Sequence, residues 1–132
     1  MKLKHVDVIT LFVDDVSAAK RFYQEIFELP VVFENEDSAV FRSGELTINL
    51  LDVAQAPDLI GPATVASRDS GSRFQFTVEV DDVDMVCAEL AAQGVKLING
   101  PMDRSWGVRT AAFADPGGHI WEIAHDLPRT ES

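Results

Sequence analysis

A four-residue segment occurs twice in this chain, and the repeat constrains the architecture more than any single motif does. Val13-Asp14-Asp15-Val16 returns 67 residues later as Val80-Asp81-Asp82-Val83. Each copy follows an apolar run with the alternation of a strand and opens a helical pattern of roughly a dozen residues. Such a repeat indicates two copies of one supersecondary unit. We therefore expect two similar units, with a site built between them.

The first copy predicts the element order β-α-β-β-β. Residues 7–13 alternate like a strand, and either Asp14 or Asp15 can cap the following helix by accepting a free amide hydrogen of its first turn. Apolar residues at helical spacing run from Val16 to Glu28, and Pro30 ends the helix. Three further strands are expected at residues 31–35, 39–42 and 46–51.

The second copy repeats this order. Its first strand is expected at residues 73–80, and its helix starts at Val83 and is closed by Gly94, where a positive φ costs little. Strands are expected at residues 95–98, 108–114 and 119–124. The sequence Asp115-Pro116-Gly117-Gly118 predicts a turn between the last two.

We interpret the chain as one α+β domain over residues 1–132, in which two βαβββ units form curled mixed sheets around a cleft, with helices on the outer face. Unit one spans residues 5–53 and unit two residues 73–126. The connector, residues 54–72, is rich in Pro, Gly and Ser and lacks a sustained period. It is long for a compact domain, and it is either a linker or a lid over the site.

In each unit the helix must bury its apolar stripe on the more apolar sheet face. That face is predicted to hold Ile9, Leu11, Val13, Ile48, Leu50, Phe74, Phe76, Val78, Trp121 and Ile123. Thr10, Phe12, Asn49, Gln75, Thr77 and Glu122 fall on the opposite face. Polar groups there must meet water or a ligand, because unpaired burial costs roughly 1–3 kcal/mol each. The face is therefore either a ligand cavity into which Asn49, Gln75 and Glu122 point, or an ordinary solvated sheet surface.

Composition excludes several functional classes. The formal net charge of −11 argues against nucleic acid and anionic lipid as partners, because both are bound through cationic contacts to phosphate. No apolar stretch approaches the roughly 20 residues that span a bilayer. Cys87 is the only cysteine, and it is expected in the core rather than as a nucleophile. We expect a cytoplasmic protein.

Three segments carry a resemblance to a known family. They are Ile9 to Val16 with Ala19-Lys20-Arg21-Phe22-Tyr23, then Phe76 to Asp84, and finally Trp106-Gly107-Val108-Arg109 through Phe113-Ala114-Asp115-Pro116-Gly117-Gly118-His119-Ile120-Trp121-Glu122-Ile123-Ala124. With these three segments in this order, the chain resembles the glyoxalase / bleomycin resistance / extradiol dioxygenase superfamily, whose members are also called vicinal oxygen chelate proteins. The resemblance covers essentially the whole chain and implies the paired βαβββ fold.

Enzymes of that family hold a divalent metal with His, His and Glu, sometimes with Gln or a second Glu, on the first and last strand of each unit. The resemblance carries these positions onto Val8, Asn49, Gln75 and Glu122. Val8 has no donor atom and Asn49 is a weak neutral ligand, so imidazole and sufficient charge are both missing. His5 lies out of phase, His119 is expected to be structural, and His125 is expected to be exposed. We therefore predict no metal and no other cofactor.

The binding branch of the family keeps the fold without a metal, which makes a small-molecule-binding protein our first hypothesis. Its ligand would lie in the inter-unit cleft of a homodimer, contacting Phe12, Asn49, Gln75, Trp106, Arg109 and Glu122. Trp106 could stack on the ligand. Glu122 could accept hydrogen bonds from the ligand, or it could pair with Arg73 or Arg109. Arg109 can equally form a structural ion pair. The alternative is a lyase, isomerase or dioxygenase with one divalent ion at Gln75 and Glu122. A third possibility is an interaction module with a filled cleft.

Overall fold

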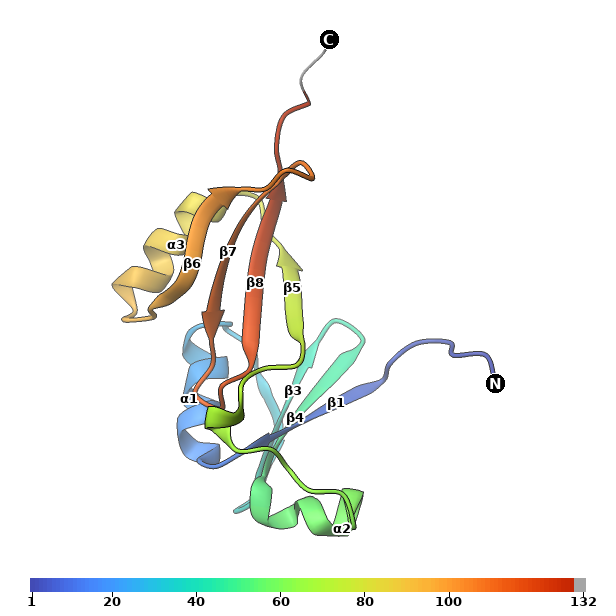
Figure 1. The fold of residues 1–132 in the computed structure, drawn as a ribbon. Coiled ribbons are helices and arrows are strands. Elements are labelled where there is room, and N and C mark those ends of the chain that lie inside the picture. The colour runs from blue at the N-terminus through green and yellow to red at the C-terminus, as the bar shows by residue number, and fades with distance from the viewer. Residues whose placement is uncertain (130–132) are drawn as a thin grey trace. The chain divides into compact units, whose positions relative to one another are not determined.

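The computed structural model describes residues 1–129 and divides the chain into two compact units, residues 1–70 and the residues from 71 onward. Each unit contains a four-stranded mixed sheet and a ten-residue helix (Figure 1). The predicted α+β class and the repeated βαβββ unit are confirmed. The residues that we predicted to be a connector fall mainly in the first unit.

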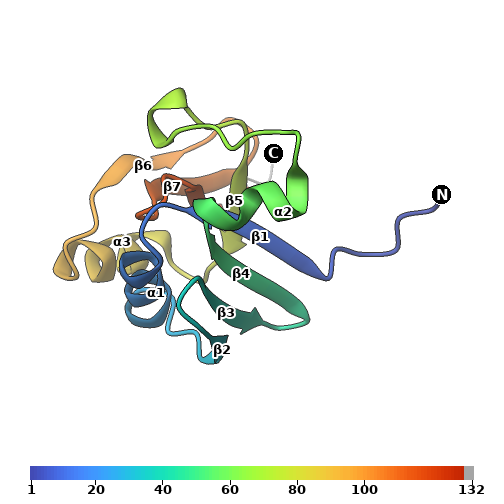
Figure 2. The same ribbon diagram turned by 90° about the horizontal axis from the view of Figure 1, so that it is seen from below.

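The first unit follows the predicted order. Its sheet has the strand order β1-β4-β3-β2, with β1 and β4 parallel and the other neighbours antiparallel. The elements are β1 (Val8–Val13), α1 (Val16–Glu25), β2 (Val31–Glu34), β3 (Ser38–Ser43) and β4 (Leu46–Asp52). Figure 2 shows α1 lying against one face of this sheet. Tyr23 of α1 is fully buried and packs against Phe41 of β3, with 5.7 Å between ring centroids.

The structure decides between the two candidate caps of α1. Asp15 is the N-cap, and its carboxylate accepts a hydrogen bond from the Ala18 amide over 3.0 Å. The helix ends three residues earlier than we predicted. Glu28 has a φ of 53°, and the Leu29 amide donates to the Tyr23 carbonyl over 3.3 Å. A left-handed residue with this type of hydrogen bond stops a helix before the proline is reached.

The second unit has the strand order β5-β8-β7-β6, with β5 and β8 parallel. Its elements are β5 (Gln75–Glu79), α3 (Val83–Ala92), β6 (Leu97–Asp103), β7 (Val108–Ala114) and β8 (Ile120–Asp126). The order and the turn before β8 match the prediction. Gly94 has the expected positive φ of 80° just after α3.

Two groups cap the start of α3. Asp82 occupies the N-cap and accepts from the Met85 amide over 3.1 Å. His125 Nδ1 accepts from the Val83 amide over 2.8 Å. His125 is therefore partly buried with a defined partner, and the expectation that it would be exposed is wrong. Strand periodicity alone could not show that β8 continues past Ala124 and reaches the helix start.

β6 extends well beyond the predicted strand at residues 95–98. It continues through Gly100 and Pro101 to Asp103, because β7 offers a partner along that length, with irregularities in register. Gly100 permits this close approach. Its φ is 86°, and a Cβ placed on it would lie 2.5 Å from the Thr110 carbonyl oxygen.

The segment at residues 54–72 is not structureless. It contains the short helix α2 (Ala56–Ile60), preceded by the 3-10 turn η1 (Val53–Gln55), and a second 3-10 turn, η2 (Arg68–Ser70). Asp52 caps the first turn by accepting from the Ala54 amide over 2.9 Å. The helix was missed because five residues are too few to establish a helical period.

Most of the predicted helix-facing side chains are buried in the first unit, where Ile9 is only partly buried, and fewer are buried in the second. Leu11, Val13 and Leu50 are buried, as are Trp121 and Ile123. Phe74 and Val78 are instead 51% and 40% exposed. α3 packs chiefly against β6, β7 and β8, so the edge strand β5 receives little cover.

Candidate functional site

In the first unit, the sheet face opposite α1 carries Thr10, Phe12 and Asn49. The parallel register pairs Thr10 with Asn49, and the Asn49 amide nitrogen lies 3.5 Å from the Thr10 hydroxyl. Val8 lies on the same face and is 52% exposed. The face therefore offers one weakly hydrogen-bonded amide and apolar walls.

In the second unit, the corresponding face carries Gln75, Thr77 and Glu122. The register pairs Thr77 with Glu122, and the Thr77 hydroxyl donates to Glu122 Oε1 over 3.0 Å. Glu122 is partly buried, whereas Gln75 is exposed at the start of β5. Among the described residues, no Lys, Arg or His lies within 4.0 Å of the Glu122 carboxylate. Glu122 thus places its charge on the sheet face opposite α3 with a single neutral partner among the described residues.

Arg109 lies on the other face of the second sheet, the face covered by α3. Its guanidinium pairs with Asp84 of α3 at 2.9 Å and with Asp103 of β6 at 2.8 Å. Arg109 lowers the pKa of Asp84, and the two carboxylates raise the pKa of Arg109. The structural ion pair allowed by the sequence is therefore present, and a pair between Arg109 and Glu122 is not formed, because their strand positions face opposite sides of the sheet.

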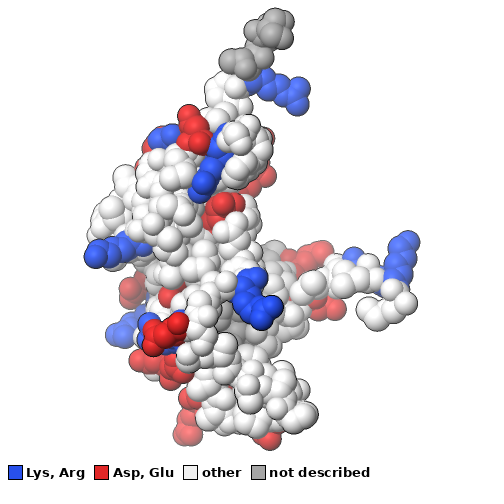
Figure 3. Space-filling model, in the orientation of Figure 1, with Lys and Arg blue, Asp and Glu red and all other residues white. Residues whose placement is uncertain are grey.

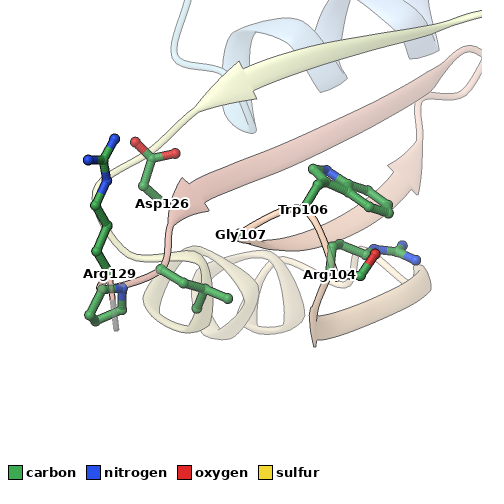
Figure 4. Close-up of a pocket in the computed structure, with 8 residues that line it drawn as sticks. Arg104, Trp106, Gly107, Asp126 and Arg129 are labelled. Atoms are coloured by element: carbon green, nitrogen blue, oxygen red, sulfur yellow. The ribbon is translucent and has the colours of Figure 1, made fainter. Parts of the chain in front are cut away.

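A hollow of about 760 Å³ lies at the end of the second unit, where the turn between β6 and β7 meets the chain beyond β8. It is lined by Arg104, Ser105, Trp106, Gly107, Asp126, Leu127, Pro128 and Arg129 (Figure 4). A backbone hydrogen bond of 2.9 Å from Leu127 to Gly107 joins its two walls. Trp106 is 68% exposed, and the Arg104 guanidinium lies over its ring at 5.7 Å.

The sequence pointed to Trp106 but not to the charged residues of this hollow, Arg104, Asp126 and Arg129. The adjacency of Arg104 to Trp106 in a turn with Gly107 was the available signal. Nothing in the linear sequence indicated that Asp126 and Arg129 would meet this turn, because the hydrogen bond between the two segments links positions 20 residues apart.

The histidines and the cysteine show no catalytic arrangement. His5 lies 2.7 Å from Asp7 before β1, and His119 contacts the buried Asp115 through both its amide and its ring. Cys87 is buried, and burial raises the pKa of its thiol. Within residues 1–129, no three His, Cys, Asp or Glu side chains gather in a way that could hold a metal ion.

The donor set at the positions implied by the family resemblance does not fit the usual metal centre. Val8 contributes no ligand atom, Asn49 is neutral, and Glu122 already accepts a hydrogen bond from Thr77. One carboxylate with two amides lacks the charge and the imidazole that a tightly held transition-metal ion requires.

Charged side chains are interspersed rather than segregated. Acidic groups are spread over the face seen in Figure 3, with Lys and Arg between them. No helix within residues 1–129 has both the length and the hydropathy needed to cross a membrane.

Comparison with known proteins assigns the chain to a family. The model of the Glyoxalase/Bleomycin resistance protein/Dioxygenase superfamily matches residues 2–123. A glyoxalase/bleomycin resistance protein/dioxygenase from Nocardioides has a similar structure, with a TM-score of 0.86 and 22% identity over 100% of this chain and 92% of that one. TnmS3, an antibiotic binding protein from a Streptomyces species, has a TM-score of 0.70 and 25% identity over 98% and 99% of the two chains. Metallothiol transferase FosB of Staphylococcus saprophyticus is 23% identical over 92% of this chain and 76% of its own length. Since the family model covers nearly all of the described residues, this chain belongs to the Glyoxalase/Bleomycin resistance protein/Dioxygenase superfamily.

Proposed function

We propose that this protein binds a small organic molecule without a metal ion, using the polar sheet face that carries Glu122. The observation that carries the proposal is the state of Glu122. Its carboxylate is partly buried on the sheet face opposite α3, with Thr77 as its hydrogen-bond donor and no cationic partner among the described residues. Such a charge is stabilised when a ligand brings an ammonium or another strong donor to it.

The chemistry of the donors supports binding without a metal. The positions that would hold the ion include Val8 and Asn49, which together bring no charge and no imidazole. TnmS3 is named as an antibiotic binding protein, so a protein of similar fold serves as a binder. We infer the same class of function here, with the ligand a small organic compound that bears a hydrogen-bond donor for Glu122. The homodimer expected from the family remains a prediction.

The second candidate is a divalent-metal enzyme, a lyase, isomerase or dioxygenase. It is favoured by the shared face of Gln75 and Glu122, which places two oxygen donors on neighbouring strands. It is also favoured by the relation to a protein named metallothiol transferase. The remaining donor positions, Val8 and Asn49, do not complete a metal site.

Calorimetry separates the two candidates. Ni²⁺, Mn²⁺, Zn²⁺ and, under anaerobic conditions, Fe²⁺ are titrated into the protein and into Glu122→Ala. We expect no binding at micromolar affinity that depends on Glu122. Binding near one ion per chain that is lost in Glu122→Ala would overturn the proposal and favour the enzyme.

A compound screen by thermal shift, in the presence of chelator, then tests ligand binding directly. We expect hits to raise the melting temperature of the native protein and of Glu89→Gln, a matched charge change on the exposed side of α3, but not of Glu122→Gln. Stabilisation that is equal in all three proteins would contradict a role for Glu122.

A further inference from the structure

The hollow at the end of the second unit is positively charged within an acidic chain. Residues 71–132 contain five Lys and Arg residues, and two of them, Arg104 and Arg129, line this hollow. Among the described residues neither guanidinium has a carboxylate within 4.0 Å, whereas Arg109 of the same unit is held by two. Two cationic groups that are not neutralised by the protein favour an anionic occupant.

Arg104 is fixed in place by neutral partners. Its Nε donates to the hydroxyl of Thr110 over 2.9 Å, and Thr110 is only 1% exposed. One terminal nitrogen lies 3.5 Å from the Asn99 side-chain oxygen, which is a weak contact. The guanidinium is therefore held in a set orientation against Trp106, and it keeps its positive charge at this end of the hollow.

Trp106 supplies an aromatic surface beside these charges. The Arg104 guanidinium covers one face of the indole ring, with 5.7 Å between its central carbon and the ring centroid. Because Trp106 is nonetheless 68% exposed, the other ring face is open. Figure 4 shows Arg104 beside Trp106 on one side of the hollow, and Arg129 beside Asp126 on the other side. An exposed tryptophan in a hollow is a surface on which a flat ligand can stack.

We propose that this hollow binds an aromatic compound that carries a carboxylate. The ring lies on the open face of Trp106, and the carboxylate is bound by Arg129 on the opposite side of the hollow. Asp126 lines the same hollow and accepts from an N–H or O–H group when the ligand has one. A volume of about 760 Å³ is in the range of sites for small organic ligands, so it accommodates a one- or two-ring compound.

This site is separate from the contact proposed for Glu122. Glu122 and Asp126 lie on the same face of β8, four residues apart, which is roughly 13 Å along a strand. The two sites also require opposite charges on the ligand. The inference therefore does not rest on the proposed function, and either can fail alone.

The test compares 1-naphthylacetate with its neutral amide, 1-naphthylacetamide, by ¹H–¹⁵N nuclear magnetic resonance on the full chain. The chain has two indole N–H signals, from Trp106 and the buried Trp121, and a Trp106→Phe variant assigns them. We expect the acid to shift the Trp106 signal saturably, to leave the Trp121 signal in place, and to bind at least tenfold more tightly than the amide.

Variants locate the charge that binds the acid. Arg129→Gln is expected to weaken binding of 1-naphthylacetate at least fivefold, whereas Arg73→Gln, the same charge change outside the hollow, changes it less than twofold. Trp106→Ala is expected to abolish tight binding, followed through backbone amide signals. Glu122→Gln leaves the affinity unchanged, which separates this site from the proposed function.

Three results would overturn the inference. The first is equal binding of the acid and the amide, which removes the role of the charge. The second is equal weakening by Arg129→Gln and Arg73→Gln, which reduces the effect to net charge. The third is binding of acetate or inorganic phosphate as tight as that of 1-naphthylacetate, which removes the role of the ring.

Discussion

The repeated Val-Asp-Asp-Val segment allows one capping role to be tested in two places. In each copy the second aspartate accepts a hydrogen bond from a first-turn amide, Asp15 at 3.0 Å and Asp82 at 3.1 Å. Replacing an N-cap aspartate by alanine typically costs about 1 kcal/mol, because a backbone donor loses its partner. We expect Asp15→Ala and Asp82→Ala each to lower the free energy of unfolding by about 1 kcal/mol.

The first aspartate of each copy provides the matched control. Asp14→Ala and Asp81→Ala remove the same charge from adjacent exposed positions that do not serve as caps. We expect them to change stability by no more than about 0.5 kcal/mol. The comparison therefore separates capping from a general effect of removing negative charge.

Urea denaturation followed by far-ultraviolet circular dichroism measures these differences. With a slope of about 1–3 kcal/mol per M, loss of one cap lowers the unfolding midpoint by roughly 0.3–1 M. The double variant Asp15→Ala/Asp82→Ala should show the sum of the two effects within about 0.5 kcal/mol, since the caps lie in different units. A destabilisation by Asp14→Ala equal to that of Asp15→Ala would refute the assignment.

Two further predictions concern the second unit. In the native protein the Arg109 guanidinium lowers the pKa of Asp84. In Arg109→Gln we therefore expect this pKa to rise towards its ordinary value, as measured from carboxyl resonances by nuclear magnetic resonance. A carboxyl pKa that folding lowers stabilises the protein at pH values above the unfolded pKa of roughly 3.9, and this stabilisation is lost as the pH falls through the folded pKa. Arg109→Gln should therefore reduce the loss of stability on acidification. An unchanged Asp84 titration would contradict this. We expect Gly100→Ala to destabilise the protein by roughly 2 kcal/mol or more in urea denaturation, because its Cβ would lie 2.5 Å from the Thr110 carbonyl oxygen. Gly44 also has a positive φ but has open space around it, so Gly44→Ala should cost only about 1 kcal/mol. Equal effects of the two substitutions would show that backbone strain alone explains both.

Much of the fold could be predicted because the signals were local and repeated. Alternation over residues 7–13 and the helical stripe after Val16 each require only a short window. The elements that differed depend on distant partners. β6 passes through Gly100 and Pro101, a composition typical of a turn, because β7 lies alongside to pair with it. Phe74 and Val78 are exposed because α3 packs mainly on other strands, which periodicity within β5 cannot reveal.

The candidate site divides in the same way. Glu122 and Thr77 could be placed on one face by counting in twos, and their hydrogen bond follows from the strand register. Arg109 lies on the opposite face of the sheet, and its partners come from α3 and β6, which counting along one strand cannot identify. The role of Arg104 depends on Thr110 and on the chain beyond β8, so it became visible only when the turn and the end of β8 were placed in space.

The pairing of first and last strands has a consequence for the order in which each unit folds. β1 pairs with β4 across 39 residues, as Ile9 with Ile48, and β5 pairs with β8 across 45 residues, as Phe76 with Trp121. By contrast, β3 and β4 are joined by a tight turn between Ser43 and Leu46. Closing a long loop costs more chain entropy than closing a short one, and non-local pairing slows folding. The three-stranded antiparallel part of each unit should therefore form early, and the strand that precedes each Asp-Asp cap should be the last to dock.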